Sequence, residues 1–209
     1  MEGKIDLKKT YKELYTAKKQ PSLVEVPALA CLAVDGSGDP NSSQRFQDCV
    51  AALYSVAFTL KFSLKKSRGL DWGVLGLEGD WWSEDMEAFA AGRKADWKWT
   101  LLIVQPDSVT DAEAAAAIEA AREKAARAKI EASPALAELR FERRPPERAA
   151  HILHLGPYDA ETENIERLHA FIASNGLRLA GRHREIYLSD ARRTSPDKLK
   201  TIIRQPCTG

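Results

Sequence analysis

The sequence has very little net charge and no long apolar run, and each of these absences excludes a class of protein. Lysine and arginine together number 31 against 30 aspartates and glutamates, so the basic excess that neutralises nucleic-acid phosphates is missing. No apolar run approaches the roughly 20 residues that span a bilayer. We therefore expect neither a nucleic acid nor a membrane as a partner.

Cysteine is also scarce. Cys31, Cys49 and Cys207 are odd in number and far apart in the chain, which is typical of reduced intracellular thiols and not of a disulfide framework. The first fifteen residues contain no apolar stretch like that of a secretory signal. We expect a cytoplasmic protein without disulfides.

Motifs for metal, nucleotide or nucleophilic chemistry are missing as well. His151 and His154 form an H-x-x-H pattern, but on a strand this spacing puts the two imidazoles on opposite faces. The glycines of GSGDPN (36–41) are not followed by the Lys-Ser/Thr of a phosphate-binding loop. The expectation from sequence is no metal, no cofactor and no activated cysteine.

What is present is an alternation of strand and helix patterns. Apolar spacing and turn residues predict strands over 22–36, 71–80, 97–106, 138–144, 148–156, 181–190 and 197–206. The helical period predicts helices over 43–66, 110–132 and 159–176. Capping residues support these helices: Ser42 or Ser43 and Thr110 or Asp111 at the starts, and Gly176 at an end.

The second half of this pattern repeats the first. TLLIVQP (100–106) and KTIIRQP (200–206) both end a strand in Gln-Pro, and the preceding strands end in Asp80 and Asp190. The connection is ten residues longer in the first half, and the excess falls within residues 81–96. We predict an α+β fold of tandem pseudo-symmetric β-α-β-β repeats. They would form a mostly antiparallel sheet with helices on one face and a ligand cleft on the other.

The predicted organisation is a single domain over 1–209. Its parts are a basic N-terminal arm (1–20), the first repeat (21–106), a connecting helix (107–137) and the second repeat (138–206).

Four of the five tryptophans lie close together, at Trp81, Trp82, Trp97 and Trp99. One interpretation is packing in a core or sheet. The other is a wall for a flat ligand, because aromatic faces bind aromatic and cationic groups. On strands, Trp97 and Trp99 share a face while Trp81 and Trp82 point to different sides. The repeat has Leu199 where the first half has Trp99, which favours the ligand wall.

Five stretches spread along the chain carry a resemblance to a known family. They are PSLVEVPALACLAVDGSGDPN (21–41), LEGDWW (77–82), DWKWTLLIVQPDSVT (96–110), HLGPYDAETENIERLHAFI (154–172) and EIYLSDARRTSPDKLKTIIRQP (185–206). They resemble the GyrI-like family, which is also described as the effector-binding fold of multidrug-responsive regulators. The resemblance implies two β-α-β-β repeats of the SHS2 type around a ligand cleft. It also implies that the ligand is bulky and planar, polycyclic or cationic.

The resemblance also implies an activity. A subset of the family without a DNA-binding domain carries the tryptophan-rich segment. These members hydrolyse the cyclopropane of DNA-alkylating natural products related to yatakemycin, in an aromatic cage. No helix-turn-helix or coiled-coil pattern precedes residue 21, so we expect the free-standing type and a role in detoxification or drug resistance.

The candidate site residues are an acid and several aromatic side chains. Glu185 lies mid-strand and shares a face with His183 and Tyr187. From the residues alone it is a solvated strand residue, whereas the resemblance implies an acid that contacts ligand. Tyr158 either packs on its own helix or covers the ligand. The implied catalytic residues are Glu185, which activates water, and Tyr187. The implied ligand-binding residues are Trp81, Trp82, Trp97, Trp99 and Tyr158.

Two function classes remain open from the sequence. One is a hydrolase that opens a strained ring by adding water. The other is a binding module without catalysis, which sequesters or senses a small molecule or binds a protein such as gyrase. An enzyme clears an excess of ligand, and a binder removes only one equivalent.

Overall fold

The computed structural model describes residues 4–84, 93–128 and 134–209, and it divides into two compact units. Unit 1 contains residues 1–7, 29–77 and 82–144, and unit 2 contains residues 8–28, 78–81 and 145–209. Each unit is therefore assembled from separate segments of the chain. Among the described helices, none is long and apolar enough to cross a membrane.

Unit 1 is built around three antiparallel strands in the order β4-β2-β5. These are β2 (Leu29–Ser37), β4 (Lys98–Gln105) and β5 (Arg140–Arg144). The central strand β2 places Leu32 opposite Ile103 on one side and opposite Phe141 on the other. Residues 29–34 of β2 are all buried, so β2 forms the core of this unit.

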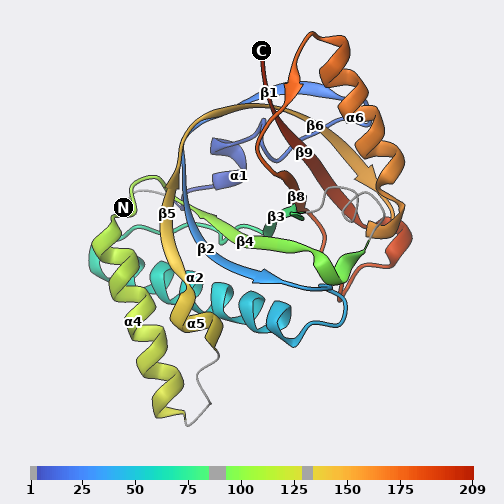
Figure 1. The fold of residues 1–209 in the computed structure, drawn as a ribbon. Helices are drawn as coiled ribbons and strands as arrows, with labels where there is room; N and C mark the ends of the chain where they lie inside the picture. The colour runs from blue at the N-terminus through green and yellow to red at the C-terminus, as the bar shows by residue number, and fades with distance from the viewer. Residues whose placement is uncertain (1–3, 85–92, 129–133) are drawn as a thin grey trace. The chain divides into compact units, whose positions relative to one another are not determined.

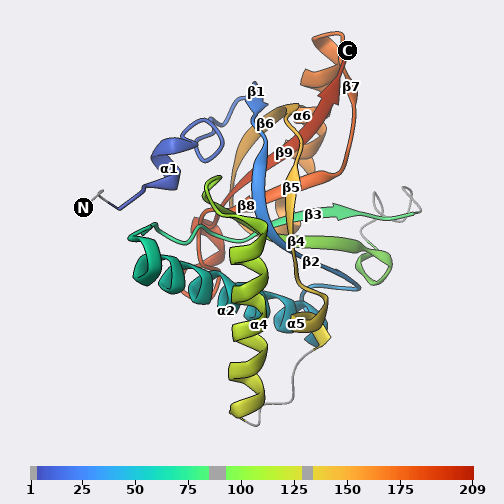
Figure 2. The same ribbon diagram turned by 90° about the vertical axis from the view of Figure 1, so that its left-hand side faces the viewer.

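Three helices pack on this sheet, as Figures 1 and 2 show for α2, α4 and α5. They are α2 (Gln44–Arg68), α4 (Asp111–Arg127) and α5 (Pro134–Glu138). The predicted caps are confirmed, because the Ser43 hydroxyl accepts a hydrogen bond from the amide of Phe46 and Thr110 forms a capping box with Glu113. The expected helix over 110–132 ends at Arg127, and residues 129–133 lie outside the described part of the chain.

Unit 2 contains an antiparallel sheet in the order β1-β6-β9-β8-β3. Its strands are β1 (Ser22–Val26), β3 (Glu78–Trp82, of which the first four residues belong to this unit), β6 (Glu147–Leu155), β8 (His183–Tyr187) and β9 (Lys200–Thr208). A short strand β7 (Arg178–Leu179) adds to β9. Helix α6 (Thr162–Ser174) packs on this sheet through Leu168 and Ile172, and Figure 1 shows it alongside β6 and β9.

Short helical turns complete the two units. They are α1 (Leu7–Thr10), η1 (Lys94–Asp96), η2 (Tyr158–Ala160) and η3 (Pro196–Lys198). Gly176 follows α6 with φ 71°, in the left-handed region that glycine favours, and so ends the helix as expected.

The α+β class and the antiparallel pairing predicted from sequence are confirmed. Several boundaries differ. The strand expected over 71–80 is observed only as Glu78–Trp82, and the strand expected over 181–190 only as His183–Tyr187. The expected strand over 22–36 divides around Pro27 into β1 and β2, because proline has no N–H for a ladder hydrogen bond. Gly79 does not end a strand but lies inside β3.

The two units contain strands and a long helix in a similar order, and the tandem repeat itself stays a prediction from sequence. Unit 1 contains β2, α2 and β4, and unit 2 contains β6, α6, β8 and β9, while β1 joins unit 2 and β5 joins unit 1. The segment 81–96, predicted as the longer connection of the first half, contains residues 85–92, which lie outside the described residues.

Candidate functional site

The candidate site lies in unit 2, on one face of β8. Side chains alternate along a strand, so His183, Glu185 and Tyr187 point to the same side. The partner of Glu185 on β9 is Ile203, which belongs to the apolar cluster under α6. The site residues therefore share the face on which α6 packs.

Each oxygen of Glu185 faces a different partner. The Tyr187 hydroxyl donates a 2.8 Å hydrogen bond to Oε2. The Nε2 atom of His183 lies 3.5 Å from Oε1, and the His183 and Glu185 side chains are only 7% and 12% exposed. Glu185 is therefore a largely buried and oriented carboxylate, and the solvated alternative does not hold.

Two tyrosines stand next to this carboxylate. The rings of Tyr158 and Tyr187 meet edge to face, with centroids 5.5 Å apart and an interplanar angle of 75°. Burial, and then the negative charges of Glu185 and Glu161, raise the pKa of Tyr158 to about 12. Burial and Glu185 also raise the pKa of Tyr187 well above its usual value. Both phenols therefore stay protonated and act as hydrogen-bond donors at neutral pH.

Sequence reasoning missed a second acid, Glu161. It lies at the N-cap of α6, and its carboxylate, the His183 imidazole and the Glu185 carboxylate each offer one atom within 4.8 Å of the others. Glu161 is 24 positions from Glu185 along the chain, so no local pattern could have joined them. Burial, and then the charge of His183, lower the pKa of His169 of α6.

Trp81 completes the cluster from β3. It is the register partner of His183, while Gly79 is the partner of Glu185. The Trp81 ring folds back over Gly79 so closely that a Cβ at residue 79 would be 2.8 Å from the indole Nε1. Glycine at this position therefore allows the indole to lie over the residue that pairs with Glu185.

The other predicted tryptophans belong to unit 1. Trp99 is fully buried: its ring packs edge to face on Phe46 at 5.3 Å, and its Nε1 donates to the carbonyl of Gly38. Trp81 is also buried, at 3% exposed, so burial alone does not separate the two rings. The contacts with Phe46 and Gly38 give Trp99 a packing role, whereas Trp81 lies on the strand paired with β8. Trp82 and Trp97 are partly exposed, and Lys94 Nζ lies 5.7 Å from the centroid of the Trp97 ring.

The structure thus brings together four of the seven predicted site residues. Those four are Trp81, Tyr158, Glu185 and Tyr187.

The opposite face of β8 has a structural role. Arg184 is nearly fully buried and donates a 2.6 Å hydrogen bond to Asp80, its register partner on β3. The Arg204 guanidinium donates to the carbonyl of Leu14, and the Tyr15 hydroxyl donates to Glu78 at 2.6 Å. Of these bonds, the one between Arg184 and Asp80 joins β8 to β3, and so it helps to hold the strand whose other face carries the site.

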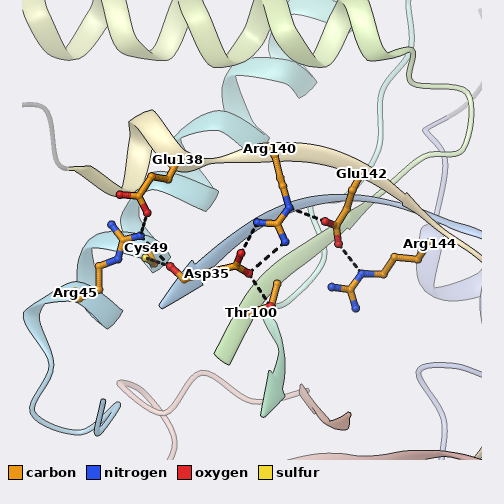
Figure 3. A network of polar contacts seen from close by, with 8 residues as sticks. All are labelled: Asp35, Arg45, Cys49, Thr100, Glu138, Arg140, Glu142 and Arg144. Carbon is orange, nitrogen blue, oxygen red and sulfur yellow. Dashed lines mark hydrogen bonds and ion pairs between the residues drawn. The ribbon is translucent and has the colours of Figure 1, made fainter. Parts of the chain in front are cut away.

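A second polar network lies in unit 1, as Figure 3 shows. Arg140 bridges Asp35 at 2.9 Å and Glu142 at 2.7 Å, and the Thr100 hydroxyl donates to Asp35 at 2.7 Å. Burial raises the pKa of the nearby Cys49 thiol to about 11, so it stays protonated and a poor nucleophile. This network links β2, β4 and β5 and has no feature of a catalytic site.

The two histidines of the H-x-x-H pattern lie apart, as strand geometry predicts. His154 lies 3.1 Å from the carbonyl oxygen of Pro157 and 3.0 Å from the Asn164 amide nitrogen. His151 is the register partner of Arg204 instead.

The comparison with known families decides the identity. The GyrI-like small molecule binding domain matches residues 19–206, nearly the whole chain. The chain belongs to the GyrI-like family. As a GyrI-like domain it binds small molecules, which agrees with a cluster that combines aromatic rings and carboxylates.

Solved structures agree with this assignment. An uncharacterized conserved protein from Listeria innocua is 34% identical with a TM-score of 0.84, over 98% of this chain and 100% of that chain. A hydrolase encoded by lin2189 of the same organism is 33% identical with a TM-score of 0.83, over 99% of this chain and 100% of that one. No curated protein matches the sequence.

A more distant likeness concerns the nucleic-acid prediction. EcmrR in a complex with DNA is 15% identical with a TM-score of 0.54, over 96% of this chain and 60% of that chain. At this identity the likeness shows the fold alone. Since the fold also occurs in a chain bound to DNA, the absence of a nucleic-acid partner stays a prediction from charge.

Proposed function

We propose that this GyrI-like protein binds a bulky planar molecule at the unit 2 cluster and hydrolyses cyclopropanoid DNA-alkylating compounds. The observation that carries the proposal is the oriented carboxylate of Glu185, held by the Tyr187 hydroxyl beside Trp81. The similarity to a Listeria innocua hydrolase supports hydrolysis as the reaction class.

The roles follow from the chemistry of each group. The planar ligand stacks on Trp81, and the stacking places its strained ring near Glu185. Glu185 accepts a proton from water as the water oxygen attacks a cyclopropane carbon. The carbon–carbon bond breaks, and its electron pair moves into the conjugated ring system toward the carbonyl oxygen.

Tyr158 is the donor for that oxygen. Its raised pKa keeps the phenol protonated, so it can hydrogen-bond to the oxygen as negative charge develops there. The proton taken by Glu185 then returns to the product, so the sum is addition of one water. No part of the proposal depends on Trp82, Trp97 or Trp99.

Turnover of a cyclopropanoid substrate by the purified protein tests this function. We expect Glu185→Gln to lower the rate by roughly 100-fold or more, the usual contribution of a general base. Glu166→Gln, which changes an exposed carboxylate of α6, is the matched control and should react like wild type. The enzyme proposal fails if wild type is no faster than buffer, or if Glu185→Gln retains the full rate.

Binding without catalysis is the second candidate, and the small-molecule-binding character of the family favours it. Stoichiometry separates the two functions. A protein that protects against only one equivalent of ligand is a sequestering module, while clearance of many equivalents requires turnover.

A further inference from the structure

We propose that Glu161, His183 and Glu185 bind one divalent first-row transition-metal ion, for which Zn²⁺ is the probe. The three side chains come from two elements, the start of α6 and strand β8. One ligand atom from each lies within 4.8 Å of the others, and Glu161 and His183 are both buried. A buried group of one imidazole and two carboxylates is a ligand set of transition-metal sites.

The spacing is close to that of a metal site. Zinc binds nitrogen and oxygen ligands at about 2.0–2.2 Å, so the ligand atoms around one ion are roughly 3–3.5 Å apart. His183 Nε2 and Glu185 Oε1 are already 3.5 Å apart. The Glu161 oxygen lies within 4.8 Å of the other two ligand atoms, so ion binding would require it to move closer by a rotation about its terminal torsion, which is soft in glutamate. Strand β8 stays fixed during this change because it is paired with both β3 and β9.

The two oxygens of Glu185 have divided roles. Tyr187 donates its hydrogen bond to Oε2, while Oε1 is the atom that faces His183. A hydrogen bond to the outer oxygen of a carboxylate ligand orients it for the metal, as second-shell partners commonly do. Oε1 of Glu185 is therefore the oxygen placed to bind the ion together with His183.

The donor set also selects among ions. Calcium prefers six to eight oxygen ligands, and magnesium keeps several waters in an octahedral shell. An imidazole with two carboxylates suits Zn²⁺, Mn²⁺ or Fe²⁺ instead. The two negative charges would balance the charge of a divalent ion, and this offsets the cost of burying both carboxylates.

The sequence expectation of no metal rested on His151 and His154, which lie apart, and on the lack of a second Cys or Asp cluster. Glu161 and His183 approach one another only in the folded unit 2.

Ion binding has a consequence for the proposed hydrolysis, and only this consequence rests on the proposed function. An ion held by Oε1 of Glu185 removes the carboxylate that would accept a proton from water. We therefore expect Zn²⁺ to suppress turnover of a cyclopropanoid substrate, and a chelator to restore it.

The site itself is tested without turnover. Chelator-treated protein is titrated with ZnCl₂, MgCl₂ and CaCl₂ by isothermal titration calorimetry. We expect one Zn²⁺ per chain and no comparable binding of the other two ions. Glu161→Gln and His183→Gln should each weaken Zn²⁺ binding at least tenfold, and Glu163→Gln, an exposed carboxylate in the first turn of α6, should not.

Anomalous diffraction at the zinc edge from crystals of wild-type protein adds a measurement that needs no variant. An ion within bonding distance of all three side chains supports the proposal. Absence of binding, equal affinity in all variants, or an ion at another place overturns it. Because no readout here involves substrate, the metal site can fail while hydrolysis stands, and the reverse also holds.

Discussion

At the scale of single residues, the site depends on how closely the Trp81 indole approaches Gly79. The indole lies over Gly79, the register partner of Glu185. A side chain at residue 79 would occupy the space of the ring. Gly79 therefore allows the Trp81 indole to take this position.

Gly79→Ala should therefore move the Trp81 indole. The added methyl would be 2.8 Å from Nε1 and 3.1 Å from Cε2 of that ring, both shorter than a van der Waals contact. We expect a loss of about 1–3 kcal/mol in the free energy of unfolding, which is typical of overpacking, and weaker binding of planar ligands. Urea unfolding and quenching of tryptophan fluorescence by ligand measure the two effects.

Gly73→Ala is the matched control, because a Cβ at residue 73 would meet no atom within 4 Å. It should leave both stability and binding nearly unchanged. If Gly79→Ala behaves in the same way as Gly73→Ala, Trp81 does not depend on this glycine.

At the scale of elements, the two faces of β8 have different roles. His183, Glu185 and Tyr187 form the site on one side, while Arg184 on the other side bonds to Asp80 and fixes the strand. The period of two in a strand makes this division visible in sequence, so the grouping of Glu185 with His183 and Tyr187 was predictable.

The rest of the site was not predictable, for two physical reasons. Glu161 approaches β8 only because α6 packs on the same face of the sheet, and this contact between distant segments leaves no local pattern. Trp81 and Trp99 look alike in sequence, but one lies beside the site and the other fills the core of unit 1. Burial of a tryptophan depends on neighbours such as Gly36 that only the fold supplies.

The two faces of helix α2 differ in burial, and this difference gives a prediction at the same scale. Leu60 is fully buried, whereas Phe62 is 59% exposed, with Phe58 and Lys61 of the same helix against its ring. We expect Leu60→Ala to lower the free energy of unfolding by about 2–5 kcal/mol, because it removes core contacts and leaves a cavity. Phe62→Ala should cost less than about 1 kcal/mol.

Chemical unfolding of both variants under the same conditions checks this difference. A large loss from Phe62→Ala would mean that the exposed aromatic side of α2 is covered in solution. The stack of Tyr54, Phe58 and Phe62 would then be an interface.

At the scale of the whole molecule, buried histidines make the stability of the fold depend on pH. In unit 2, burial and then the nearby positive charge of Arg204 lower the pKa of His151 to about 4. Burial and His183 lower the pKa of His169 as well. Both imidazoles are therefore neutral in the folded protein at pH values where they would be protonated in the unfolded chain.

Stability should consequently fall as the pH is lowered from 7.5 to 5. The pKa of His151 is near 6.5 when unfolded and about 4 when folded, so the unfolded chain binds more protons in this range. Its contribution is fully present above pH 6.5 and is lost as the pH falls toward 4, about 1–2 kcal/mol of it by pH 5. His169 acts in the same direction. The paired acids Asp71 and Asp190 have folded pKa values of about 2 and ordinary values of 3.8, so their contributions are lost only in more acidic solution.

Urea unfolding at pH 7.5 and 5 measures the loss of stability, and His151→Gln should make this loss smaller because the variant has no imidazole to protonate. An equal loss in wild type and in the His151→Gln variant would show that other groups determine the acid sensitivity of this fold.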